Sequence, residues 1–157
     1  MPRGRSSLAI GVMAKAPVAG FAKTRLIPLL GEIGAAKLQA SLIEQTLETC
    51  RAAAPGGVSL FITGEGGEPY WAECRRAYGA ALVEQRGQTL GERMDHATGV
   101  LLGCAPRALL VGTDCPGLRV HHLHAAAAAL RGRSLVFIPA TDGGYVLVGA
   151  TGRYPSA

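Results

Sequence analysis

The stretch LAIGVMA, residues 8–14, decides the fold, because it is an apolar run of strand length that stops at Lys15 and Pro17. A run without polar alternation predicts a strand that is buried on both faces, as the strands of parallel sheets are. Similar runs recur at Val58–Thr63 and Ala108–Thr113, and segments with helical spacing separate them. This alternation predicts an α/β domain in three layers, with helices on both faces of a mostly parallel sheet.

Spacing and punctuation predict the other elements. Apolar residues recur at steps of three and four through Glu32–Ala54, and a Pro-Gly-Gly sequence ends that helix. Thr89 is a candidate N-cap for a helix over Leu90–Leu102. Further helices are expected at Pro69–Tyr78 and Val120–Leu130, and further strands at Ala81–Glu84, Leu135–Ile138 and Tyr145–Val148. We expect Ala108–Thr113 to lie centrally in the sheet, and Tyr145–Val148 is a candidate antiparallel strand.

Length and charge limit the classes of partner. A chain of 157 residues is expected to form one domain with its own core, over residues 1–157. The net charge is +5, carried mostly by arginine, whose planar fork suits phosphate and carboxylate groups. No basic run is longer than Arg75-Arg76, which argues against a nucleic-acid surface. No apolar run approaches the ~20 residues of a membrane span. An anionic small molecule is therefore the favoured partner.

The cysteines and the N-terminal stretch bear on location. The four cysteines form no C-x-x-C pair, which argues against a zinc site and favours reduced thiols. Arg3 and Arg5 before the first apolar run imitate a signal peptide, but that run is short and Pro17 would follow the cleavage site directly. We therefore expect a cytoplasmic protein.

Three loops follow the carboxyl ends of predicted strands, where ligands bind in open α/β sheets. The first reads KAPVAGFAKTRL over residues 15–26. A glycine loop with cations after the first strand suits a phosphate group, which backbone N–H groups and charged side chains would bind. The candidate phosphate-binding residues of this loop are Lys15, Gly20, Lys23 and Arg25. Ala22 stands where a Walker A loop requires glycine, and a solvated loop with ordinary surface cations is the alternative.

Two aspartates follow other strands. Asp114, after the run Ala108–Thr113, is placed to hold Mg²⁺ or Mn²⁺, since magnesium takes one or two carboxylates together with substrate phosphates. Asp142 lies in the third loop and would complete a metal site or orient a substrate hydroxyl. For both, a simple turn is the alternative, because aspartate is a common turn residue. Gly91 and Arg93, at a predicted helix start, are further candidates for nucleotide contact.

Several motifs occur together in this chain, in a fixed order. They are MAKAPVAG (13–20), KTRL (23–26), QTLGERM (88–94), GTDCPGL (112–118) and DGGY (142–145). The set resembles the bacterial family of nucleotide-diphospho-sugar transferases, also labelled glycosyltransferases. That family has a GT-A-like, Rossmann-like fold and is related to the molybdenum-cofactor and 2-phospholactate guanylyltransferases. The resemblance extends from Leu8 to Val148.

The resemblance implies a role for each matching residue. The implied roles are phosphate binding for Gly20, Lys23 and Arg25, nucleotide contact for Gly91 and Arg93, metal binding for Asp114, and a place near the second substrate for Asp142, the candidate catalytic base. Ala19 stands where proline is more usual. Family members resemble chains of about 200 residues, a size that still fits one domain. The present sequence is therefore expected to lack the C-terminal part usual in the family.

The expected function is that of a Mg²⁺-dependent transferase acting on a nucleotide or a nucleotide-diphospho-sugar, by glycosyl or nucleotidyl transfer. Two alternatives stay open. One is guanylyl transfer to a phosphorylated small acid. The other is a catalytically silent module that binds a nucleotide without turnover.

Overall fold

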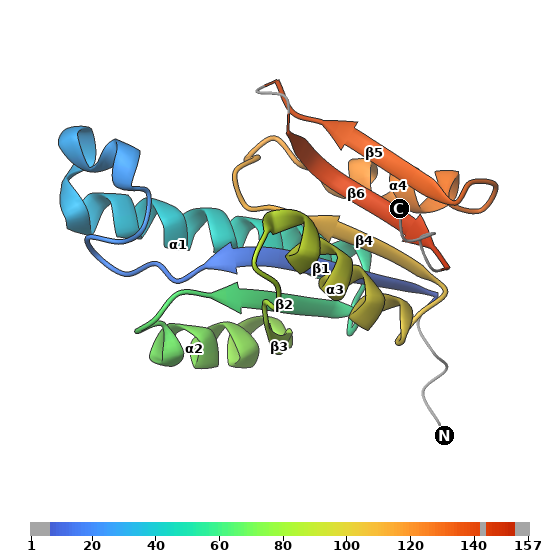
Figure 1. Cartoon of the computed structure of the whole chain (residues 1–157), viewed down its shortest axis with the longest axis horizontal. Helices are drawn as coiled ribbons and strands as arrows, with labels where there is room; N and C mark the ends of the chain where they lie inside the picture. The colour runs from blue at the N-terminus through green and yellow to red at the C-terminus, as the bar shows by residue number, and fades with distance from the viewer. Residues whose placement is uncertain (1–6, 142–143, 153–157) are drawn as a thin grey trace.

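The computed structural model describes residues 7–141 and 144–152. Within these residues the strands form one six-stranded sheet with the order β3-β2-β1-β4-β6-β5 (Figure 1). The strands are β1 (Leu8–Lys15), β2 (Val58–Thr63), β3 (Ala81–Glu84), β4 (Arg107–Val111), β5 (Leu135–Pro139) and β6 (Tyr145–Thr151). The first four are mutually parallel, and β6 runs antiparallel to both β4 and β5. The prediction of a mostly parallel sheet with β4 in a central position is confirmed.

Helices cover both faces of this sheet, so the predicted three-layer α/β/α architecture is confirmed (Figure 1). The helices are η1 (Thr24–Leu26), α1 (Ile27–Ala53), α2 (Glu68–Tyr78), α3 (Leu90–Leu102) and α4 (Val120–Ala129). Helices α1, α2 and α4 supply the buried side chains of one core layer, together with β1, β2 and β4. Helix α3 packs on the opposite face against β1 and β4.

Strand β1 is buried on both sides, as its unbroken apolar sequence predicts. Ile10 and Val12 are fully buried and face α1, α2 and α4. On the other face, Gly11 lets α3 approach closely, since a Cβ atom there would lie 2.7 Å from Phe61 Cε2 and 2.9 Å from Leu101 Cδ1. A larger residue at position 11 would therefore push against both neighbours.

The helix boundaries agree with the sequence signals at two informative places. Helix α1 begins at Ile27, but the backbone of Gly31, with φ 74° and ψ 167°, interrupts it. The uninterrupted helix therefore begins at Glu32, as predicted. Thr89 caps α3: its side chain accepts from the Glu92 backbone N–H at 3.1 Å, and the Glu92 carboxylate accepts from the Thr89 N–H at 3.2 Å. This reciprocal pair satisfies two amide donors that the first helical turn leaves free.

Two strand ends differ from the predictions by more than one residue. Strand β4 ends at Val111, two residues early, because the chain turns away from β1 there. Strand β6 continues to Thr151, beyond the predicted Val148, because its last residues pair with the start of β4.

Among the described residues, one helical segment, Thr24–Ala53, is long and apolar enough to cross a membrane by length and composition alone. Sequence inspection did not anticipate this segment, because charged residues interrupt its apolar runs. The core helix of a globular domain passes the same test, and Ile43, Leu47 and Cys50 of α1 are fully buried against the sheet. The segment is thus weak evidence for a membrane span.

Candidate functional site

A cavity of about 580 Å³ opens at the edge of the sheet where β1 and β4 end. These two strands are parallel neighbours, with β2 and β3 on one side and β6 and β5 on the other. Strand order reverses at this point, and such switch points form the ligand-binding crevice of open α/β sheets. The described lining residues are Met13, Lys15, Ala22, Lys23, Gln39, Leu90, Met94, Leu110, Val111, Gly112, Thr113, Asp114, Cys115, Ala140, Gly144, Tyr145, Val146 and Val148.

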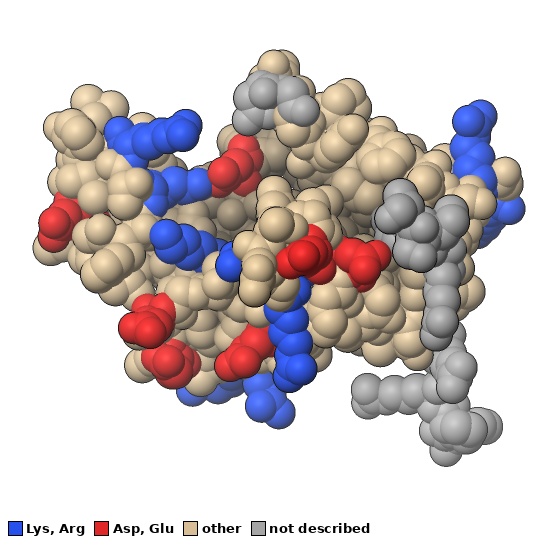
Figure 2. Space-filling view, in the orientation of Figure 1, with Lys and Arg blue, Asp and Glu red and all other residues tan. Residues whose placement is uncertain are grey.

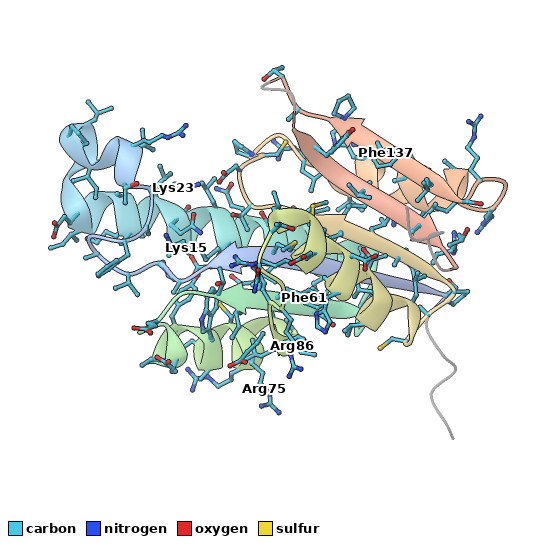
Figure 3. The ribbon with its side chains drawn as sticks, viewed as in Figure 1. Lys15, Lys23, Phe61, Arg75, Arg86 and Phe137 are labelled. Atoms are coloured by element: carbon cyan, nitrogen blue, oxygen red, sulfur yellow. The ribbon has the colours of Figure 1, made fainter. Side chains whose placement is uncertain are left out.

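One end of the cavity is charged. Lys15 leaves the end of β1, Lys23 follows in the loop before η1, and Asp114 follows β4. The Lys23 ammonium donates a hydrogen bond to Asp114 Oδ1 and forms an ion pair with it. Figure 3 shows both lysines at this end of β1, and Figure 2 shows basic side chains around a hollow with an acidic group beside them. The structure therefore brings together three of the residues that the sequence singled out.

The other end of the cavity is apolar. Met13 and Leu110 form its floor on the α3 side of the sheet, and Leu90 and Met94 of α3 form one wall. The β5–β6 hairpin also lines the cavity, and its Tyr145 ring is tilted against that of Phe137 with the ring centroids 5.1 Å apart. A ligand of the whole cavity would thus present charge at one end and a flat or apolar group at the other.

The loop between β1 and η1 is held by its own backbone. The carbonyl oxygen of Val18 accepts hydrogen bonds from the N–H groups of Phe21 and Ala22, both at 3.0 Å. Gly20 has φ 87°, a left-handed conformation that a side chain would strain. Lys23 also has positive φ, at 48°, and is the one described non-glycine residue that does. The tight turn ends by directing Lys23 across the cavity to Asp114.

Sequence reasoning missed Gln39, although it lines the cavity. This side chain is 5% exposed, and its Nε2 donates to the Lys15 carbonyl oxygen at 3.0 Å, while Oε1 has no partner among the described residues. Gln39 lies three residues after Ala36 and four before Ile43, on the buried stripe of α1. A polar residue on an otherwise apolar stripe was the available signal.

Other predicted site residues lie outside the lining. Arg25 is exposed beyond the cavity, and Gly20 supports the loop without facing it. Arg93 points back along the chain, where its Nε donates to the Gly87 carbonyl oxygen at 3.0 Å, and Gly91 is exposed. The helical turn that carries them contributes Leu90 and Met94 instead. Asp142 lies outside the described residues. Tyr145, the first residue of β6, lines the cavity.

Asp114 suits a cation of the magnesium type better than one that needs several protein ligands. Among the described residues, no three His, Cys, Asp or Glu side chains converge, and Asp114 is the one acidic group that lines the cavity. Its side chain is 76% exposed. Mg²⁺ binds in this way in many phosphate sites, through one or two carboxylates, several waters and the phosphates of the substrate. The residues present therefore fit such an ion.

The family described as "Uncharacterized protein conserved in bacteria (DUF2064)" matches residues 46–157. This chain belongs to the DUF2064 family. The match covers the chain from Thr46, in the last third of α1, onward, including β4, Asp114 and the β5–β6 hairpin. No curated protein matches the DUF2064 chain.

Solved structures show the fold independently. A protein from Desulfovibrio desulfuricans G20, described as a "putative nucleotide-diphospho-sugar transferase", is 28% identical and superposes with a TM-score of 0.79 over 93% of this chain. The present chain spans 64% of that protein. The resemblance inferred from the sequence motifs is thus confirmed.

More distant structures share the fold alone. A cytidylyltransferase from Leptospira borgpetersenii serovar Hardjo-bovis is 15% identical with a TM-score of 0.59, and the match covers 93% of this chain and 60% of that one. The 4-diphosphocytidyl-2C-methyl-D-erythritol synthase from Anaerococcus prevotii DSM 20548 is 12% identical with a TM-score of 0.56, over 92% of this chain and 72% of that one. At these identities the two structures show that the DUF2064 chain shares their fold.

Proposed function

We propose that this chain binds a nucleotide or a nucleotide-diphospho-sugar in the cavity at the ends of β1 and β4, and transfers a glycosyl or nucleotidyl group with the help of Mg²⁺ or Mn²⁺. One observation carries the proposal: the cavity is charged at one end and apolar at the other. A nucleotide has the same asymmetry, since its phosphates are anionic and the flat faces of its base pack against apolar side chains. The likeness to the Desulfovibrio protein supports the same ligand class.

Different residues would bind the two ends of the ligand. The Lys15 and Lys23 ammonium groups would contact the phosphates, where charge-assisted hydrogen bonds are the strong ones. Leu90 and Met94 would pack against the base and exclude water from it. Asp114 would hold the divalent cation, which supplies charge neutralisation of the phosphates when bound. In such transfers the protein chiefly positions the reacting groups. Asp142 is proposed as the catalytic base, the group that accepts a proton from the acceptor substrate.

A thermal-shift screen tests the ligand class. Nucleoside triphosphates and nucleotide-diphospho-sugars are added with and without Mg²⁺, and a ligand that prefers the native state raises the melting temperature. The matched pair of variants is Lys15→Met, which removes a cavity cation, and Lys37→Met, which removes an exposed lysine of α1 outside the cavity. We expect Lys15→Met to lose most of the shift and Lys37→Met to keep it. Absence of a shift with every nucleotide would contradict the proposal.

The released product then distinguishes the reactions. Nucleotidyl transfer from a triphosphate, including guanylyl transfer to a phosphorylated small acid, releases pyrophosphate. Glycosyl transfer releases a nucleoside diphosphate. When acceptors such as phosphorylated small acids are also supplied, a ligand that binds without any release over hours would favour a silent nucleotide-binding module.

A further inference from the structure

The ion pair between Lys23 and Asp114 joins the two groups to which the proposed function assigns different partners. Lys23 is assigned to phosphate and Asp114 to the divalent cation, yet in this structure the ammonium donates directly to Asp114 Oδ1. The carboxylate is 76% exposed, whereas the Lys23 side chain is only 20% exposed. The lysine therefore contacts one oxygen of a carboxylate that is otherwise open to solvent, and its positive charge lies where a cation would bind.

The surroundings of this pair leave a divalent ion no ready alternative. Asp114 is the one acidic side chain among the described lining residues of the cavity. An ion arriving alone would have to displace the ammonium from Oδ1, or bind Oδ2 beside an ammonium that repels it, and either arrangement weakens its binding. A ligand shifts such an equilibrium only by its differential affinity for the two arrangements.

The backbone around Lys23 provides a means of release. Lys23 adopts φ 48° and ψ 47°, a left-handed conformation that costs a side-chain-bearing residue about 1–2 kcal/mol. Gly20 and Gly31, both with positive φ, lie before and after it. The buried Ala22 and its bond to the Val18 carbonyl oxygen hold the start of this segment in place, so a shift is confined to Lys23 and the residues up to Gly31. Anionic phosphates entering the cavity would offer the ammonium a second acceptor.

We infer that Lys23 occupies the cation position of Asp114 in the free protein, and that the phosphates of the substrate draw it away and so create the divalent-cation site. The inference rests on the proposed function and adds an order to it: phosphate first, or phosphate and cation together, and not cation alone. Binding of the two ligands is then coupled through Lys23, and linkage makes that coupling reciprocal.

The test measures Mn²⁺ binding in the absence of any nucleotide, by calorimetry and by the electron paramagnetic resonance signal of free Mn²⁺. The proteins are wild type, Lys23→Met, and Lys37→Met as the matched control. Lys23→Gly serves as a second variant, because glycine accepts the left-handed backbone and also removes the ammonium. We expect both Lys23 variants to bind Mn²⁺ about fivefold more tightly than wild type, as removal of a competing ion pair allows, and Lys37→Met to match wild type.

The double variant Lys23→Met/Asp114→Asn locates the site, and we expect it to lose the added Mn²⁺ affinity. Equal Mn²⁺ affinity in wild type and in both Lys23 variants would overturn the inference, as would the absence of measurable binding in all of them. Added affinity that survives Asp114→Asn would overturn it as well. These results are independent of the nucleotide screen. A failed inference with nucleotide-dependent stabilisation intact leaves the proposed function standing. Tighter Mn²⁺ binding by the Lys23 variants without any nucleotide-dependent stabilisation removes the proposed function, and with it the role of the phosphates, but leaves the competition between Lys23 and the cation at Asp114.

Discussion

Gln39 Nε2 donates a hydrogen bond of 3.0 Å to the carbonyl oxygen of Lys15. The bond ties the buried stripe of α1 to the last residue of β1, at the point where the chain enters the loop before Lys23. The donor end of the amide is thereby fixed, so Oε1 must be the atom that lacks a partner among the described residues. A buried acceptor without a partner lowers the stability of the fold. Substitutions of Gln39 that keep this oxygen and substitutions that remove it should therefore differ in their effect on stability.

Gln39→Glu and Gln39→Met should differ in stability. At neutral pH the glutamate would bury a charge and face the Lys15 carbonyl with an oxygen, which should cost about 2 kcal/mol or more. Methionine loses the hydrogen bond but also removes the unpartnered oxygen, so its change should stay within about 1 kcal/mol. Urea unfolding measures both. Because a protonated glutamate can donate to Lys15, the penalty of Gln39→Glu should shrink as the pH is lowered. Equal destabilisation by both variants would contradict this account.

Arg25 offers a second comparison, because the sequence places it beside Lys23 whereas the structure places it outside the cavity lining. Lys15→Ala should weaken nucleotide binding by about 1.5–3 kcal/mol, the contribution of a charged hydrogen bond. Arg25→Ala should weaken it by less than about 1 kcal/mol, as expected for an exposed charge. Calorimetric titration with the best ligand of the screen measures the difference. An Arg25→Ala effect as large as that of Lys15→Ala would show that the loop closes over the ligand.

Two glycine substitutions test the packing of α3 on the sheet. Gly11→Ala should destabilise the protein by about 1–3 kcal/mol, because its methyl group would overlap Phe61 and Leu101. Gly99→Ala, in the last turn of α3, meets nothing within 4 Å and should stabilise by up to about 0.5–1 kcal/mol through helix propensity. The changes in the free energy of unfolding of both variants are measured from their denaturant midpoints. A neutral Gly11→Ala would mean that α3 packs less closely than described.

Alkaline pH should destabilise the fold through buried acidic groups. Burial raises the pKa of the Cys50 thiol from 9.0 to about 12, and burial also raises the pKa values of Cys74, Tyr70 and Tyr78. These groups stay neutral in the native state but ionise in the unfolded chain, so stability is full below about pH 9 and falls as the pH rises beyond it. For Cys50 alone the loss at about pH 10.5 is about 2 kcal/mol.

Cys50→Ala isolates that contribution. The variant should show a shallower decline of unfolding free energy between neutral and alkaline pH than wild type, whatever its stability at neutral pH. Cys104→Ala is the matched control, because Cys104 is exposed. Identical pH slopes for wild type and Cys50→Ala would remove Cys50 as a cause.

Local signals were readable from the sequence, and distant ones were not. The capping of α3 by Thr89 and Glu92 depends on residues three apart, and the start of the uninterrupted α1 at Glu32 follows from Gly31 beside it. The convergence of the β1 and β4 loops also follows, because carboxyl ends of parallel strands share one edge.

Side-chain directions at that edge depend on three-dimensional packing. The pairing of Lys23 with Asp114 spans 91 residues and requires the left-handed turn at Lys23, which nothing in the local sequence demands. Arg93 was expected at the ligand, but its bond to Gly87 turns it back along the chain. Gln39 was missed because periodicity was judged from apolar residues alone. Reading the polar exceptions on a buried stripe would have found it.

The topology also sets when the cavity comes into existence during folding. The β5–β6 hairpin and the capped α3 form from residues close in sequence, and such local contacts form early. The pairing of β1 with β4 joins Val12 to Val111, so the charged end is completed by a long-range contact that is entropically slow to close. A ligand that contacts both ends of the cavity cannot bind the transition state of folding if the pairing of β1 with β4 is absent from that state. It would then prolong the lifetime of the native state and leave the refolding rate unchanged.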